Sequence, residues 1–113
     1  SFNYLKKVFE INFFSQVKLY LKICKNLNRL KKKVSIFNID SKSVINGGFK
    51  IYEYSTSKAA TANLFKSLQR EYNNIQFINY TIPSVKKIRD KNSISYDNYI
   101  KDLSNTIKKY TLN

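Results

Sequence analysis

The chain has 113 residues, of which 42% are hydrophobic and 15% aromatic. It is therefore at most one domain, and it has the apolar content of a folded core rather than of a disordered segment. No apolar run reaches the length of a membrane span, and no targeting peptide is visible. The single cysteine, Cys24, excludes an internal disulfide and fits a reducing compartment. We expect a cytoplasmic protein without membrane contact.

The net charge of +14 would suit a protein that binds nucleic acid. The lysines are spread along the chain, however, and only three residues are arginine, the preferred residue for bidentate contacts with phosphates and bases. A composition rich in lysine, asparagine, isoleucine and tyrosine is also typical of an AT-rich coding sequence. We expect no nucleic-acid partner and keep a basic nucleic-acid-binding domain only as a less favoured alternative.

Residues 2–28 are predicted to form one long amphipathic helix, because apolar residues recur at helical spacing with lysines between them. A basic connector follows at 29–33. Residues 34–39 are predicted to form a strand, since they are rich in β-branched and aromatic residues. Residues 40–50 are predicted to form a loop, because they contain an Asn-Gly-Gly turn signal.

Residues 52–72 are predicted to form a second long helix that contains several alanines. A second strand follows at 75–80, and it is nearly all apolar or aromatic, as expected where both faces of a sheet are covered. Residues 81–95 are predicted to form a polar loop. A third helix is predicted at 97–110, capped by Ser95 or Asp97.

The order helix, strand, helix, strand, helix predicts an α/β fold. A long crossover helix between two strands implies that the strands pair in parallel. Two parallel strands are too few for a stable open sheet, and an apolar strand at an edge is an aggregation hazard. The pattern therefore indicates that the chain is part of a larger sheet.

Tyr54 and Lys58 lie four residues apart, on one face of the second predicted helix. A lysine charge nearby stabilises a phenolate, so such a tyrosine can exchange a proton with a substrate oxygen near neutral pH. Chance alone yields roughly 1.4 such pairs in this composition. Adding Ser57 before the lysine and Ser41 thirteen residues before the tyrosine lowers that expectation to on the order of 0.02. No metal-ligand set is expected.

These motifs resemble the short-chain dehydrogenase/reductase family, of the classical type. Tyr54 to Ala60, Y-S-T-S-K-A-A, is similar to the active-site helix of that family, and residues 34–41 resemble the strand that ends in its catalytic serine. Asn12 lies where the family carries a catalytic asparagine. Residues 75–83 resemble the next strand and its terminal proline, Pro83. The last helix resembles the one after the family's substrate loop, so the likeness covers nearly the whole chain.

The resemblance implies an NAD(P)-dependent oxidoreductase that transfers hydride between the nicotinamide of NAD or NADP and an alcohol or carbonyl substrate. Tyr54 would be the general acid/base, and Lys58 would stabilise its phenolate and hold the cofactor ribose. Ser41 would orient the substrate oxygen, and Asn12 would help to hold a water that links Lys58 to solvent. Tyr54, Lys58 and Pro83 would contact the cofactor. The family also implies a homodimer or homotetramer for the full-length protein.

Several positions depart from the family pattern. Ser84 follows Pro83 where the family has glycine, Ile88 falls near its cofactor-binding threonine, and Asp40 replaces a serine. No glycine-rich phosphate loop is present. We therefore expect residues 1–113 to be the C-terminal part of a single Rossmann-type, doubly wound α/β domain whose N-terminal cofactor-binding half is absent, a fragment inactive alone. The departures leave open a catalytically inactive binding or structural module derived from the family.

Overall fold

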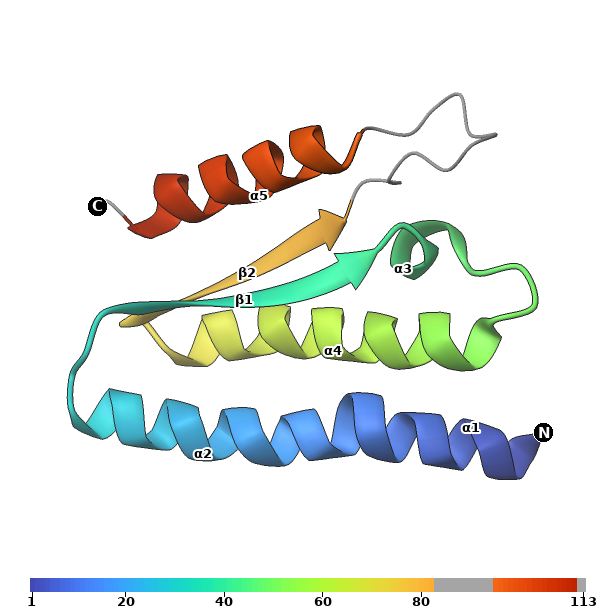
Figure 1. Ribbon diagram of the computed structural model, residues 1–113. Coiled ribbons are helices and arrows are strands. Elements are labelled where there is room, and N and C mark those ends of the chain that lie inside the picture. Colours follow the sequence, from blue (N-terminus) through green and yellow to red (C-terminus); the bar gives the residue numbers. More distant parts are fainter. Residues whose placement is uncertain (83–94, 112–113) are drawn as a thin grey trace.

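The fold is a two-stranded parallel sheet with helices on both faces (Figure 1). The computed structural model describes residues 1–82 and 95–111. Side chains of successive residues in a strand point to opposite faces of the sheet. The neighbours Asn79 and Tyr80 therefore show which helix covers each face. Asn79 donates a hydrogen bond to the carbonyl of Ala62 in one helix, whereas the Tyr80 hydroxyl donates to Asp102 in another. The α/β architecture predicted from the order of the elements is confirmed.

The N-terminal helix runs without a break along one side of the molecule. It consists of α1 (Phe2–Phe9), a π-helical turn η1 (Glu10–Phe14) and α2 (Ser15–Arg29). The predicted helix over 2–28 is thus confirmed in extent, while its π turn was not predicted. The helix ends at Arg29, and Lys31 then takes a positive φ of 53° that turns the chain toward the sheet.

Strands β1 (Val34–Ser41) and β2 (Ile75–Ile82) pair along their whole length, in register from Val34 opposite Ile75 to Ser41 opposite Ile82. The predicted ends at residues 39 and 80 were therefore too early. Polar Asp40 and Ser41 close β1, and polar Thr81 precedes the terminal Ile82 of β2, so each prediction stopped before the first of these polar residues. The backbone groups of those polar residues still pair across the sheet, so the strands continue.

Residues 40–50 were predicted to form a loop, and this prediction was wrong in part. The end of β1 and a short helix, α3 (Ser43–Asn46), occupy much of the segment. The amides of Ile45 and Asn46 both donate to the carbonyl of Lys42, which closes the single turn. Gly47 follows with a φ of 74°, a conformation that a residue without a Cβ adopts freely. The predicted turn signal therefore marks the exit from α3.

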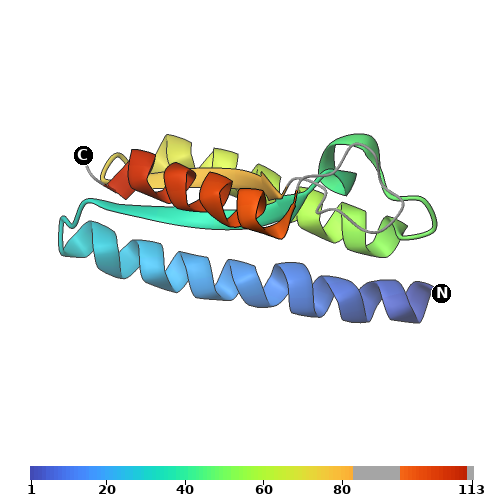
Figure 2. The ribbon, with the colours of Figure 1, turned by 45° about the horizontal axis from the view of Figure 1, so that its top comes forward.

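Helix α4 (Tyr52–Glu71) packs on the same face of the sheet as α2, and α5 (Tyr96–Thr111) lies on the other face (Figure 2). Both helices lie within one residue of their predicted bounds. Ser95 caps α5 as predicted, because its hydroxyl accepts a hydrogen bond from the amide of Asn98 at 3.3 Å. No helix in the described part of the chain is long and apolar enough to cross a membrane.

The core lies between α2, α4 and the sheet. Cys24, Leu68 and Ile75 are buried together there. Phe65 is 1% exposed, and its ring meets those of Tyr20 and Phe77 edge to face. Burial, with a smaller contribution from the charge of Glu71, raises the pKa of the Cys24 thiol. Cys24 therefore acts as a small apolar residue of the core.

Helix α5 is joined to the sheet by polar contacts toward both of its ends. The Ser35 hydroxyl donates to the carbonyl of Tyr110 at 3.2 Å, and the Tyr80 hydroxyl donates to the Asp102 carboxylate. Tyr80 is 7% exposed. Its burial, then its hydrogen bond to Asp102 and that residue's charge, raise the pKa of Tyr80 to about 12. The phenol is therefore held in its neutral, donating form.

The raised pKa of Tyr80 predicts a loss of stability in alkali. Above pH 10.0 the unfolded chain releases this proton while the folded protein keeps it up to about pH 12. The stabilisation is thus complete below pH 10.0 and is lost as the pH rises toward about 12. In urea titrations, the unfolding free energy of the wild type should fall across this range by about 2 to 3 kcal/mol more than that of Tyr80→Phe. If the unfolding free energies of the two proteins fell equally over this pH range, the prediction would be contradicted.

Candidate active site

The predicted site residues lie around the carboxyl end of β1, where ligands bind in open α/β sheets. Ser41 is the last residue of β1, and Tyr54 and Lys58 are in the first two turns of α4. Asn12 comes from the π turn of the N-terminal helix, which contacts α4. Three separate elements therefore supply the four residues. Pro83, the remaining predicted cofactor contact, lies outside the described residues.

Tyr54 and Lys58 differ in exposure although they share one helix face. Tyr54 is 40% exposed, and its hydroxyl has no hydrogen bond to any described residue. Lys58 is half-buried, and its ammonium has no ion pair within the described part of the chain. The Tyr54 side chain can thus meet a ligand from solvent, while the Lys58 ammonium, one helical turn later, has its donors available.

Asn12 is tied to α4 by both its side chain and its backbone. Its Nδ2 donates to the Ser57 hydroxyl at 3.2 Å, and its carbonyl accepts from the Thr61 hydroxyl at 3.0 Å. The carbonyl lies in a π turn, a feature that occurs often at functional sites. These two bonds fix the register between the N-terminal helix and α4.

Ser57 connects Asn12 to the helical turn that carries Tyr54. Its side chain is 0% exposed, and its hydroxyl donates to the carbonyl of Tyr54 at 2.8 Å while accepting from Asn12. From the sequence, Ser57 was predicted only as the serine that precedes Lys58 in the motif. Its structural role, like that of the buried Thr61, was missed. The available signal was a pair of small polar residues, one turn apart, on the buried face of a helix.

A cavity of about 230 Å³ lies between the N-terminal helix, β1 and α4. It brings Asn12 and Lys58 together, and its lining is otherwise partly polar, with Gln16, Tyr20, Asn38 and Thr61 among the residues that contribute to it. Burial raises the pKa of Tyr20, so its hydroxyl stays protonated. A space of this size with several polar partners can hold ordered water. The cavity can therefore connect Lys58 to water at the side of α4 that faces the sheet.

Ser41 makes its hydrogen bond to a residue that was not predicted to belong to the site. Its Oγ lies 2.6 Å from the Oγ of Ser43, and no hydrogen bond joins it to Tyr54. The neighbouring Asp40 is 3% exposed, and its buried Oδ1 has no hydrogen-bond partner among the described residues. The structure thus links Asn12, Ser57 and Tyr54 in one hydrogen-bonded chain and leaves Ser41 outside it.

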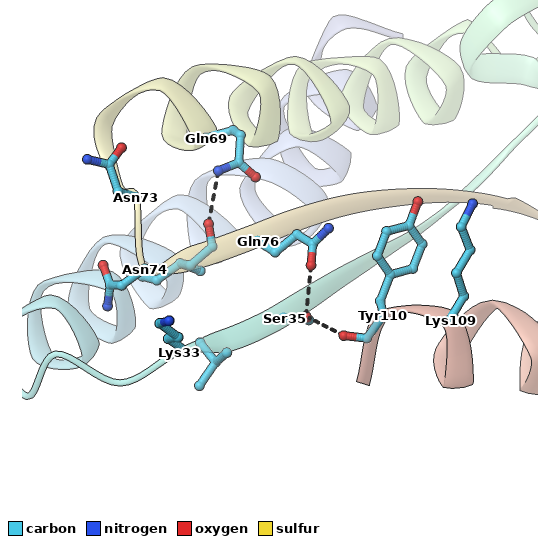
Figure 3. A pocket seen from close by; sticks show the side chains of 10 residues that line it. Lys33, Ser35, Gln69, Asn73, Asn74, Gln76, Lys109 and Tyr110 are labelled. Atoms are coloured by element: carbon cyan, nitrogen blue, oxygen red, sulfur yellow. Dashed lines mark hydrogen bonds between the residues drawn. The ribbon is translucent and has the colours of Figure 1, made fainter. Parts of the chain in front are cut away.

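A larger groove of about 940 Å³ lies at the opposite, amino end of the two strands (Figure 3). Two of its polar side chains already bind backbone groups. Gln69 donates to the carbonyl of Ile75 at 3.0 Å, and Asn74 donates to that of Lys32 at 2.7 Å. None of the predicted site residues lines this groove. Its size alone therefore does not make it the active site.

Comparison with known proteins identifies one family. Residues 2–87 match the family model described as short chain dehydrogenase. The matched segment contains the π turn, both strands and α4, and so includes Asn12, Ser41, Tyr54 and Lys58. No curated protein and no solved structure matched the chain.

Proposed function

Because the chain belongs to the short chain dehydrogenase family, we propose that it is the C-terminal part of an NAD(P)-dependent oxidoreductase acting on an alcohol or carbonyl compound. The observation that supports this best is the link between Asn12 and α4. The asparagine is hydrogen-bonded to Ser57 in the turn that carries Tyr54, and it shares a cavity with Lys58. Residues far apart in the sequence thus meet around the tyrosine–lysine pair.

The free donors of this site fit a nicotinamide cofactor. The Lys58 ammonium has no carboxylate partner in the described chain, so it can donate hydrogen bonds to the two hydroxyls of a ribose. The Tyr54 hydroxyl, one helical turn earlier and open to solvent, can reach the same hydroxyls or the substrate. When bound, the cofactor supplies or accepts the hydride. The protein then has to position the substrate and to move one proton.

Tyr54 is proposed to move that proton. In the reducing direction its hydroxyl gives a proton to the substrate carbonyl oxygen as the carbonyl carbon accepts the hydride, which yields the alcohol. The positive charge of Lys58 stabilises the phenolate left behind. Ser41 is proposed to donate a hydrogen bond to the same substrate oxygen. Water in the cavity that Asn12 and Lys58 line then returns a proton to the site.

We also propose that the rest of the Rossmann-type domain completes this sheet. β1 pairs only with β2 in the described structure, so its other edge has no hydrogen-bonding strand. The only two glycines, Gly47 and Gly48, follow β1 and lie outside any phosphate-binding loop before it. The cofactor phosphates would then bind the portion of the domain beyond this chain. The activity therefore belongs to the full-length gene product.

The N-terminal helix supports the proposal of a homodimer or homotetramer. Several of its large apolar residues face solvent, among them Phe2, Ile11 and Phe14, which are 66%, 69% and 47% exposed. Phe2 and Phe14 line one groove with Leu5 and Phe9, and contiguous apolar surface of this kind is typical of subunit interfaces. Sedimentation of the full-length protein tests the proposal, and a monomer at micromolar concentration would contradict it.

Cofactor binding tests the proposed function directly. The fluorescence of NADH and NADPH is followed on titration with the full-length gene product, for the wild type and for Lys58→Ala. Hydrogen bonds to a charged group contribute about 1.5–3 kcal/mol, so the substitution should weaken binding by about 10- to 100-fold. Lys66→Ala is the matched control, because Lys66 is an exposed lysine of the same helix.

The possible outcomes separate the competing functions. Binding that is weakened only by Lys58→Ala supports the oxidoreductase. A wild type that binds neither cofactor favours the catalytically inactive module. Equal binding by both lysine variants and the wild type would mean that Lys58 does not contact the cofactor, and the proposed assignment of this residue would be withdrawn.

A further inference from the structure

The Ser43 hydroxyl makes the single hydrogen bond that the Ser41 side chain has among the described residues. The two Oγ atoms are 2.6 Å apart, and both residues are half-buried. No other hydrogen bond of the Ser43 hydroxyl occurs among the described residues, so this side chain is not a helix cap. Its contact with the proposed substrate-orienting serine therefore needs an explanation of its own.

We propose that Ser43 is a positioning residue that donates its hydroxyl hydrogen to Ser41 Oγ, which leaves the Ser41 hydrogen free for the substrate oxygen. The inference rests on the proposed function, because it assigns a partner to the substrate-orienting serine of that same site. Ser43 itself would touch neither substrate nor cofactor.

The direction of this hydrogen bond follows from counting protons. Each hydroxyl has one hydrogen to donate, and only one of the two hydrogens can lie between the oxygens. If Ser41 donated to Ser43, it would have no hydrogen left for a substrate carbonyl, which can only accept. A bound carbonyl therefore selects the arrangement in which Ser43 donates and Ser41 faces the substrate.

The same arrangement makes Ser41 a better donor. In a chain of hydrogen bonds each one polarises the next, which strengthens them by about 10–30% per bond. The hydrogen bond from Ser41 becomes stronger as negative charge develops on the substrate oxygen during hydride transfer. An interaction that is stronger in the transition state than in the ground state raises kcat more than it lowers KM.

The backbone holds the two hydroxyls in this relation before any ligand binds. Ser41 is fixed at the end of β1 by its pairing opposite Ile82. Ser43 opens α3, whose turn is closed by the hydrogen bonds of Ile45 and Asn46 to the carbonyl of Lys42, each 3.0 Å long. Both serines are therefore held by hydrogen-bonded backbone rather than by a free loop.

The test compares Ser43→Ala, Ser43→Thr, Ser41→Ala and the double variant Ser41→Ala/Ser43→Ala in the full-length protein, with a carbonyl substrate and NAD(P)H. In Ser43→Ala the Ser41 hydroxyl is no longer polarised or held toward the substrate oxygen, so kcat should fall by about 3- to 10-fold, the range that one neutral hydrogen bond covers. The substrate KM, the cofactor Kd and the melting temperature should change little. Ser43→Thr keeps the hydroxyl and should restore most of kcat. In the Ser41→Ala background, Ser43→Ala should have no further effect.

Three results would overturn the inference: an unchanged kcat in Ser43→Ala, a lowered kcat that Ser43→Thr does not restore, or an equal loss with and without Ser41. If Ser43→Ala does not fold, the Ser43→Thr variant decides, since kcat near that of the wild type is required. Failure of the proposed function has a different signature, because the wild type would then lack cofactor binding and turnover. In that case both proposals fall together.

Discussion

Replacing Tyr54 by phenylalanine should abolish turnover in the full-length enzyme without disturbing the fold. The substitution removes only the hydroxyl, which has no hydrogen bond within the described chain, so no buried partner is left unsatisfied. The ring is 40% exposed and can keep its place. The carbonyl of Tyr54 still accepts from Ser57 at 2.8 Å, so the helical turn stays anchored.

The size of the expected loss follows from the proton that Tyr54 is proposed to move. General acid–base catalysis by a positioned side chain contributes about 10²- to 10⁴-fold, so kcat/KM of Tyr54→Phe should fall by at least about 100-fold. Cofactor binding should fall much less, because Lys58 remains. The measurement is steady-state oxidation of NAD(P)H, with cofactor titration by fluorescence on the same samples.

Tyr52→Phe is the matched control. Tyr52 is a tyrosine of the same helix, two positions earlier and 53% exposed, and the same single hydroxyl is removed. The charge of the neighbouring Glu53 and a hydrogen bond with it raise the pKa of Tyr52, which makes this phenol a poor source of phenolate. Activity that persists in Tyr54→Phe, or an equal loss in Tyr52→Phe, would remove Tyr54 from the proposed mechanism.

The long helices were predictable because their periodicity extends over several turns. The prediction of a helix over residues 52–72 compares with Tyr52–Glu71 in the structure, and that over 97–110 compares with Tyr96–Thr111. The parallel pairing was predictable too, since a crossover helix of this length leaves few alternatives. The end of β1 was not predictable from the residue pattern. Asp40 and Ser41 have low strand propensity, and they extend the strand only because they pair with Thr81 and Ile82 of β2.

The π turn at Asn12 has no counterpart in the pattern of apolar residues. It coincides with two long-range contacts, from Asn12 to Ser57 and from Thr61 to the carbonyl of Asn12. Such a deviation in a helix is set by tertiary contacts that a single sequence does not reveal. The position of Asn12 in a helix was therefore predictable, whereas the local geometry that presents it to α4 was not.

The candidate site was predictable where it follows from spacing along one element. Tyr54 and Lys58 share a helix face because they are one turn apart. Ser41 ends β1 as the family resemblance implied, although the residue pattern ended that strand at residue 39. The hydrogen-bond partners were not predictable. Ser43 reaches Ser41 only because α3 begins immediately after β1, in a segment predicted to form a loop. The catalytic roles themselves remain predictions, and the experiments on Tyr54, Lys58 and Ser43 test them.

Replacing Phe65 by alanine should have the largest effect on stability. Phe65 is 1% exposed, and its ring centroid lies 4.9 Å from that of Tyr20 in α2 and 5.3 Å from that of Phe77 in β2. The side chain therefore joins α4 to the helix and the strand beside it. Truncating a buried phenylalanine costs about 3–5 kcal/mol, from lost burial and from the cavity left behind. Small domains are stable by only about 5–15 kcal/mol.

Phe49→Ala is the control for this substitution, because Phe49 is 89% exposed and loses little packing on truncation. Denaturant unfolding of the full-length protein should place the midpoint of Phe65→Ala well below that of the wild type and leave Phe49→Ala close to it. A difference in stability between the two variants also concerns the active site. Helix α4 carries Tyr54 and Lys58, and the contact of Phe65 with Phe77 anchors this helix to the sheet. If the two variants lost equal stability, the core between α2, α4 and β2 would not be what holds α4 in place.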